Sequence, residues 1–444
     1  MNDRAVISNL LVNINNFVDH KYVLVDNKFV RKGKLSLEDA IKFPLCNTKK
    51  TTTTEVNKYI RKMCGDLSMT IKKQSVSEKM QFIDPQVYID MNDVAIMDLY
   101  EESRDMGSFK DFIVCAIDGS VVELPNDKIT RKEFEISENG EPTQNNTTGR
   151  VSCLCDVNKC YILSSIITNK KAHEHELALF HLEDIKNKIN PNKLIITYDR
   201  GYSATSMMLK TEEIGAYYLI RAKKNTFKKK QEKMKTNDET FKISINNSKT
   251  KHFHDEKLKE YAMKKRSIKV RAVKVKLKNG TTETLFTNIP PEIATTEELK
   301  ELYRQRWEIE TNYDKLKNKL KIEKFAAKTK VRIEQSFYAD IFLFNILMAI
   351  KNDADDNITR TPNKNSKYEY KYQSNFNTLT GEIKELMPEL LTNDQEQIRK
   401  IVNQIMENAS KDLVLTKMDA PTNEEREPKR NYNKKCKISS LESF

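Results

Sequence analysis

The sequence predicts a mixed α/β fold with a β-rich insertion and helical regions at both ends. Residues 112–117 are a continuous apolar run of the kind found in strands buried on both faces, and residues 194–198 predict another buried strand. A helical pattern lies between them, and strands that alternate with a helix indicate an α/β core. The Asn279-Gly280 pair, within a lysine-rich segment, is a strong hairpin signal.

The composition favours a polyanionic partner. The chain has 444 residues, and its 77 lysines and arginines outweigh 64 aspartates and glutamates, which gives a net charge of +13. This balance favours nucleic acid ahead of an acidic membrane surface. The longest apolar run, residues 341–350, is interrupted by Asn345 and is too short for the ~20 residues that span a bilayer. The N-terminus lacks the pattern of a secretory signal, so we expect a soluble intracellular protein without a membrane partner.

Residues 1–105 are expected to be mostly helical. Short amphipathic stretches at 35–43 and 75–84 are each followed by proline, and Thr51 to Thr54 offer hydroxyl caps for a helix start. Small helices that carry many lysines suit a DNA-binding unit. A helical subdomain that only caps the core is the alternative, and the pattern leaves both open.

The core strands are expected to end in acidic residues. The first strand runs into Asp118-Gly119-Ser120 and resumes at 121–124, and the strand at 194–198 ends at Asp199. A carboxylate at such a place costs stability unless a cation lies opposite. Further strands are expected at 151–157 and 160–167, and a helix at 175–189.

Residues 206–294 are expected to form a lysine-coated β insertion. A strand at 217–222 is followed by a basic run that includes Lys228, Lys229 and Lys230. Residues 268–278 alternate cationic and apolar side chains, with a slip at Ala272-Val273 that suggests a bulge. Two basic runs in one insertion favour a phosphate-contacting surface over a merely solvated face.

Two long helices follow the insertion. Thr295 and Glu298 form a capping-box pattern that opens a helix over 296–320, and residues 331–350 predict a second, buried helix. After residue 352 only 393–406 shows a helical pattern, and residues from 421 onward are expected to be a mobile tail. The predicted units are therefore 1–105, 106–205, 206–294, 295–352 and 353–444.

The cysteines do not predict a disulfide framework, because seven are scattered over a long chain. Cys153, Cys155 and Cys160 could suggest zinc, but a second ligand pair is missing, so buried thiols are favoured. His173 and His175 form a second weak metal candidate, for which a solvated helix face is the favoured interpretation.

One helix face concentrates the side chains that could bind a metal-bound anion. At ~100° per residue, Tyr303, Arg306, Glu310 and Lys317 project within an arc of roughly 60°. Two cations beside a carboxylate suit the binding of an anionic, metal-bound ligand such as a phosphodiester. Together with Asp118 and Asp199, Glu310 could hold two Mg²⁺ ions ~3.5–4 Å apart, which would activate a water or 3′-hydroxyl without a protein nucleophile.

These residues identify a resemblance to DDE transposases of the insertion-sequence type, specifically the "IS four" group. The group's Y-x2-R-x3-E-x6-K signature is matched by Tyr303, Arg306, Glu310 and Lys317, and its two aspartate motifs by Asp118-Gly119-Ser120 and Asp199-Arg200-Gly201-Tyr202. The order of the motifs also agrees.

The resemblance implies an RNase H-like core whose triad Asp118, Asp199 and Glu310 is both catalytic and metal-binding. The metal would be two Mg²⁺ ions, for which Mn²⁺ can substitute. It also implies that Tyr303, Arg306, Lys317 and Arg200 hold DNA phosphates.

The implied activity is cut-and-paste transposition, with hydrolysis at terminal inverted repeats and strand transfer into target DNA. The implied assembly is a homodimer in a synaptic complex, in a bacterial cytoplasm and associated with the nucleoid. In some relatives a tryptophan of the insertion stacks on a flipped base during a hairpin step. The only tryptophan here, Trp307, lies in the helix itself.

Two alternatives stay open at this point. A metal-dependent endonuclease would use the same residues but cleave without joining. A domesticated DNA-binding protein that no longer catalyses would be expected to have lost an acidic ligand, whereas Asp118, Asp199 and Glu310 are all present.

Overall fold

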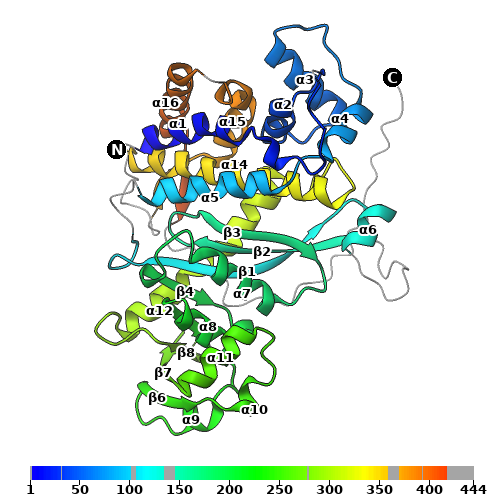
Figure 1. Ribbon diagram of the computed structural model, residues 1–444. Helices are drawn as coiled ribbons and strands as arrows, with labels where there is room; N and C mark the ends of the chain where they lie inside the picture. Colours follow the sequence, from blue (N-terminus) through cyan, green and yellow to red (C-terminus); the bar gives the residue numbers. More distant parts are fainter. Residues whose placement is uncertain are drawn as a thin grey trace.

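The computed structural model describes residues 3–31, 33–101, 107–134, 146–277, 280–358, 370–392 and 394–417. Its centre is an eight-stranded mixed sheet with the order β3-β2-β1-β4-β5-β8-β7-β6. Figure 1 shows helices covering the sheet on both sides at the β3-β2-β1 end, whereas the other end extends away from the main helical layer. The mixed α/β class predicted from the sequence is confirmed.

Five of the eight strands form the core. β1 (Ile113–Glu123), β4 (Leu194–Tyr198) and β5 (Tyr217–Arg221) are parallel neighbours. β2 (Thr148–Asp156) pairs antiparallel with both β1 and β3 (Ile162–Asn169). This order and direction are those of an RNase H-like core. The predicted interruption of the first strand is wrong, because Gly119 and Ser120 continue the ladder opposite β2.

The insertion extends the core sheet and is not a separate body. β6 (Asp238–Ser244), β7 (Ser267–Lys276) and β8 (Thr282–Thr287) form antiparallel pairs, and β8 also pairs with β5. The first strand of the range 206–294 is therefore a core strand. Because the sheet is continuous, it marks no boundary between units, and the predicted domain ranges stay predictions.

The predicted bulge at Ala272-Val273 is wrong. The ladders of β7 with β6 and β8 run through these residues without a shift. The alternation slips because Arg271 is buried as an ion-paired residue, with its guanidinium bonded twice to Asp238. An arginine at an inward position disturbs the alternation of polar and apolar residues in the same way as a bulge would, although the strand is regular.

The N- and C-terminal segments join in one helical layer. α14 (Lys330–Asp356) lies along β3, with α5 (Gln86–Glu101) beside it. α1 (Asp3–Asn13) packs against α16 (Gln395–Lys411), and both contact α14 (Figure 1). The predicted helical character of both ends is confirmed. The sequence missed α15 (Phe376–Leu390), and the predicted tail from residue 421 lies outside the described residues.

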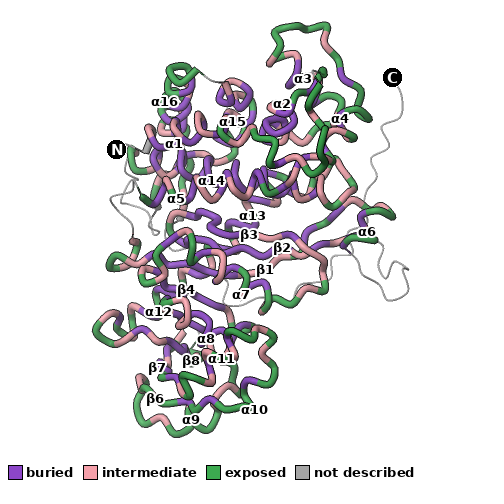
Figure 2. The backbone as a smooth tube through the Cα atoms, viewed as in Figure 1, coloured by how far each residue is buried: buried purple, intermediate pink, exposed green. Residues whose placement is uncertain are grey.

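The buried helix predicted at 331–350 is confirmed as part of α14. By length and composition α14 could cross a membrane, but 89% of its apolar window is buried inside the protein. Figure 2 shows this burial as a continuous band through α14, β3, β2 and β4, whereas the strand and helix ends of the insertion are exposed. Burial of this kind is typical of a core helix.

The single helix predicted at 296–320 is wrong in one respect. Thr295 caps it with Glu298 as predicted, but the helix is divided into α12 (Thr296–Gln305), α13 (Glu308–Asp314) and a π-helical turn η6 (Lys315–Leu320). The backbone N–H groups of Arg306 and Trp307 donate to carbonyls three residues earlier in the chain, whereas an α-helix uses the carbonyl four residues earlier. This break turns the residues after it relative to a straight helix.

The remaining elements complete the layers around the sheet. α7 packs on β1, β2 and β3, and α8 packs against β5 and α11. The bounds are as follows: η1 (Ile14–Phe17), η2 (His20–Tyr22), α2 (Leu37–Lys42), η3 (Phe43–Cys46), α3 (Thr52–Cys64), α4 (Lys73–Met80), α6 (Lys128–Phe134), α7 (Glu174–Ile185), η4 (Pro191–Lys193), η5 (Arg200–Tyr202), α8 (Thr205–Glu213), α9 (Lys228–Glu232), α10 (Asn247–Thr250), α11 (Glu256–Lys265), β9 (Tyr370–Ser374) and β10 (Leu413–Lys417).

Candidate active site

The two strand aspartates lie at matching places on neighbouring strands. β1 and β4 are parallel, and their last paired residues are Ile117 and Tyr198. Asp118 is the next residue of β1, and Asp199 directly follows the end of β4. Parallel strands lie about 4.8 Å apart, so the fold brings together two carboxylates that are far apart in the sequence.

Asp118 is partly buried, and its environment raises the pKa of its carboxyl group. Burial, together with the smaller effect of the Glu310 and Asp199 charges, raises the pKa of Asp118 from 3.8 to about 6. The Gly119 amide, which donates to its Oδ1 at 2.9 Å, and the Arg306 guanidinium act in the opposite direction. The three carboxylates are therefore close enough to affect one another, and burial is the strongest influence on Asp118.

Arg306 is the buried cation of this cluster. It is 3% exposed, and its guanidinium lies 4.0 Å from Glu310 Oε1. Its Cζ lies 5.8 Å from the Tyr303 ring centre and 4.9 Å from that of Trp307. Two aromatic rings and a carboxylate therefore hold the guanidinium beside the acidic residues.

Tyr303 and Lys317 approach the two strands from the same helical segment. The Tyr303 hydroxyl lies 3.5 Å from Asp199 Oδ1, and the Lys317 ammonium donates to the Val121 carbonyl at 2.6 Å. Lys317 also lies 3.9 Å from Glu323. Because Lys317 lies in the π-helical turn and the break at Arg306 separates this turn from Tyr303, the predicted single row spreads along β1.

The structure gathers the predicted acidic residues into one cluster but not into a ready coordination sphere. Within the described ranges, no group of three or more His, Cys, Asp or Glu side chains is arranged to hold a metal ion. The donor set nonetheless fits Mg²⁺, since carboxylate oxygens are its usual ligands. Two buried polar atoms near the cluster, Tyr202 Oη and Arg306 Nε, have no hydrogen-bond partner, which leaves them available to a bound group.

A family model, described as "Transposase DDE domain", matches residues 110–346. The chain belongs to this family. DNA transposition is therefore its activity class, and DDE transposases generally use divalent metal ions. The match contains Asp118, Asp199 and Glu310 together with the strands and helices that carry them.

Comparisons with curated proteins and with solved structures add little to the family match. The search of curated proteins found no match. Among solved structures, the chain is similar to the piggyBac transposase in a cryo-EM structure of its synaptic complex with hairpin DNA. The two share 10% identity with a TM-score of 0.39, over 92% of this chain and 73% of that one. The sheet order and strand directions of the DDE domain itself identify its RNase H-like core.

The sequence analysis assigned no role to two side chains near the acidic cluster of the DDE domain. Tyr202 is buried, and this burial, with a smaller effect of the Asp118 and Glu174 charges, raises its pKa above the usual range. Glu174 opens α7 and is ion-paired with Arg150. A Cβ at Gly119 would lie 3.7 Å from the Glu174 side chain, so this fourth carboxylate lies directly beside the Asp118 strand. The His-Glu-His-Glu pattern at the start of α7 was the available signal.

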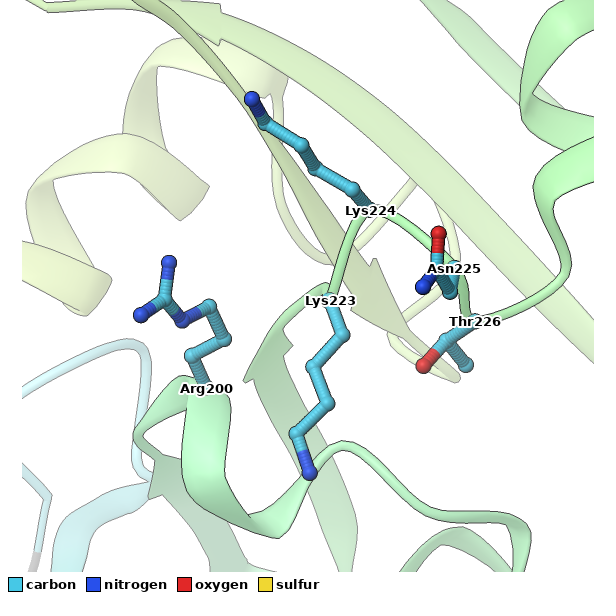
Figure 3. A pocket seen from close by; sticks show the side chains of 5 residues that line it. All are labelled: Arg200, Lys223, Lys224, Asn225 and Thr226. Atoms are coloured by element: carbon cyan, nitrogen blue, oxygen red, sulfur yellow. The ribbon is translucent and has the colours of Figure 1, made fainter.

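Arg200 lines an open basic hollow next to Asp199. The hollow has a volume of about 470 Å³ and is lined by Arg200, Lys223, Lys224, Asn225 and Thr226 (Figure 3). Lys223 donates to the Gly201 carbonyl at 3.0 Å, which ties the loop after β5 to the Asp199 motif. The lysines of this loop were noted in the sequence only as part of a basic run.

The cysteine expectation agrees with the structure, and the histidine expectation agrees in part. Cys153, Cys155 and Cys160 are buried free thiols, as the favoured interpretation predicted. His173 is exposed, whereas His175 is half-buried and stacks on Tyr202 with ring centres 5.8 Å apart. The solvated-face prediction is therefore confirmed for His173 alone.

Proposed function

We propose that the protein is a cut-and-paste transposase that cleaves transposon ends and joins them to target DNA by two-metal-ion chemistry. The neighbouring positions of Asp118 and Asp199, with Glu310 close enough to raise the pKa of Asp118, support this proposal most directly. Three carboxylates that repel one another are stabilised when a divalent cation binds among them.

The acidic residues would hold the metal, and the helix residues would hold the DNA. Asp118, Asp199 and Glu310 would supply the oxygen ligands. Two bound Mg²⁺ ions would lower the pKa of the attacking water or 3′-hydroxyl and stabilise the leaving oxygen.

Four further side chains would position the phosphates of the DNA strand. Tyr303 and Arg306 lie against the acidic residues, Lys317 lies farther along β1, and Arg200 lines the adjacent basic hollow. Arg306 is buried and lies 4.0 Å from Glu310, so a bidentate contact with phosphate requires the side chains around the guanidinium to move.

The finer assignment is to the "IS four" group, and it depends on the Y-x2-R-x3-E-x6-K spacing. In that group the substrate is double-stranded DNA that carries terminal inverted repeats, and two copies of the protein pair two DNA ends. We propose the same substrate and a homodimer for this chain. The net charge of +13 is consistent with a DNA partner.

A cleavage and joining assay tests this function. The full chain is incubated with labelled DNA that carries the element's own ends, supercoiled target plasmid and Mg²⁺. Cleavage at the ends followed by their insertion into the plasmid supports the proposal. Cleavage without insertion would instead identify a metal-dependent endonuclease, and end binding without cleavage would identify a non-catalytic DNA-binding protein.

A further inference from the structure

The backbone carbonyl of Asp118 accepts hydrogen bonds from two side chains. The Tyr313 hydroxyl of α13 donates to it at 2.7 Å, and the Ser152 hydroxyl of β2 donates at 3.4 Å. Tyr313 lies next to the Cys153 thiol. Ser152 and Cys153 are consecutive strand residues, so their side chains point to opposite faces. The carbonyl is therefore held from both faces of the sheet.

Ser152 is itself held by a buried histidine. His181 of α7 places Nε2 3.0 Å from Ser152 Oγ and Nδ1 2.8 Å from Ser164 Oγ. The Ser152 hydroxyl donates its hydrogen to the Asp118 carbonyl, so its oxygen accepts from His181 Nε2–H. The unprotonated His181 Nδ1 then accepts from the Ser164 hydroxyl. Burial lowers the pKa of His181 to about 3, so the ring stays neutral and one of its two nitrogens carries the proton.

Tyr313 connects the strand that carries one acid to the helix that carries another. It lies one turn after Glu310 on α13, and its bond to Asp118 joins residues that are far apart in the sequence. A rotation or shift of α13 relative to β1 would break this bond. The hydroxyl therefore fixes where Glu310 stands with respect to Asp118.

We propose that Tyr313, Ser152 and His181 are positioning residues that fix the Asp118 backbone and thereby the spacing of its carboxylate from Glu310. This inference rests on the proposed function, in which both carboxylates bind the metal. Loss of an outer partner of a metal ligand commonly weakens metal affinity by about 10–100-fold. We expect a loss of this size when Tyr313 is replaced by phenylalanine.

The experiment compares wild type and Tyr313→Phe in two measurements. Mn²⁺ binding to the full chain is measured by electron paramagnetic resonance, and nicking of end-carrying DNA is measured over a range of Mg²⁺ concentrations. We expect about tenfold weaker Mn²⁺ binding and a matching rise in the Mg²⁺ concentration for half-maximal nicking. Excess Mg²⁺ should restore most of the rate.

Tyr88→Phe is the matched control. Its buried hydroxyl donates to the Ile41 carbonyl at 2.9 Å in the helical layer, so it loses a bond of the same kind away from the acids. An unchanged Mn²⁺ affinity in Tyr313→Phe would overturn the inference, as would an equal shift in Tyr88→Phe. His181→Gln, which leaves α13 unaltered, should also weaken Mn²⁺ binding. An unchanged Mn²⁺ affinity in His181→Gln would contradict the proposal. This second variant keeps the proposal testable even if Tyr313→Phe does not fold. If wild type neither binds Mn²⁺ nor nicks, the proposed function itself fails.

Discussion

Asp118 and Asp199 follow the last paired residues of two neighbouring parallel strands, β1 and β4. The parallel register places the two positions side by side, so the two residues become neighbours although 81 positions separate them in the chain (199 − 118 = 81). The DDE domain builds its acidic cluster on this register, and α13 brings the third carboxylate to it.

Loss of any of the three acids should abolish catalysis and preserve DNA binding. We expect Asp118→Asn, Asp199→Asn and Glu310→Gln each to lower Mg²⁺-dependent nicking by more than about 100-fold, because each removes an anionic metal ligand. End binding, measured by gel shift, should change little. Glu301→Gln is the control, since Glu301 is exposed and paired with Arg304 on the same helical segment. Nicking retained by one of the three variants would remove that residue from the triad.

The lysines of α9 should contribute to the electrostatics of DNA binding. Lys228, Lys229 and Lys230 are exposed on the insertion. Their joint replacement by glutamine should weaken DNA binding and reduce the slope of log K against log salt by about 0.9 for each phosphate that the protein no longer neutralises. Fluorescence anisotropy at several salt concentrations measures this slope. The matched control replaces Arg399, Lys400 and Lys411 of α16, at the opposite end of the molecule (Figure 1). An unchanged slope in the α9 variant would show that its lysines are only solvated.

Arg306 should not tolerate lysine, although lysine keeps the charge. The guanidinium lies over two aromatic rings and beside Glu310, and a planar fork makes these contacts better than an ammonium does. We expect Arg306→Lys to lower nicking by about tenfold or more, which corresponds to about 1.4 kcal/mol of transition-state stabilisation. Arg304→Lys, on the exposed side of the same segment, should leave the rate unchanged. Wild-type nicking in Arg306→Lys would mean that only the charge matters.

Asn345 should be essential for stability, not for chemistry. This polar residue in the apolar helix α14 is hydrogen-bonded through both its amide oxygen and its amide nitrogen. Its Oδ1 accepts from the Ile162 N–H, and its Nδ2 donates to the Ile162 carbonyl and to Asn92 Oδ1, at 2.7–2.8 Å. Asn345→Leu leaves these buried groups without partners and should lower the free energy of unfolding by about 3 kcal/mol. Urea unfolding measures this loss. Met348→Leu on the same helix should cost less than about 1.5 kcal/mol, and an equal cost in both variants would refute the role of the hydrogen bonds.

The buried His181 should make the protein sensitive to acid. Its pKa is lowered by burial from 6.5 to about 3, so the unfolded chain binds a proton that the folded chain does not. The stability that His181 provides is complete above pH 6.5 and is lost toward pH 3, by about 1.4 kcal/mol per pH unit. His181→Gln should therefore lose less stability than wild type between pH 6.5 and 4.5, as measured by urea unfolding. Parallel losses in the two proteins would contradict this assignment.

Particular residues show how far sequence reasoning reached. The strand ending at Asp199, the capping box of Thr295 with Glu298 and the buried thiols of Cys153 and Cys155 followed from local patterns, and the structure confirms them. The regular ladder through Arg271 could not be predicted, because its partner Asp238 lies on another strand. The roles of the predicted site residues stay predictions that the variants above test.

The sequence by itself determined which side chains the chain can offer to a site and the order in which its acids occur, since these depend on residue type, spacing and periodicity. Only the tertiary structure decided that the insertion extends the core sheet, that Arg306 is buried at a helix break, and that the Tyr313 hydroxyl holds the Asp118 carbonyl. The reason is physical. Local patterns determine which face of an element is apolar, whereas contacts between residues nearly 200 positions apart form only when separate elements pack together.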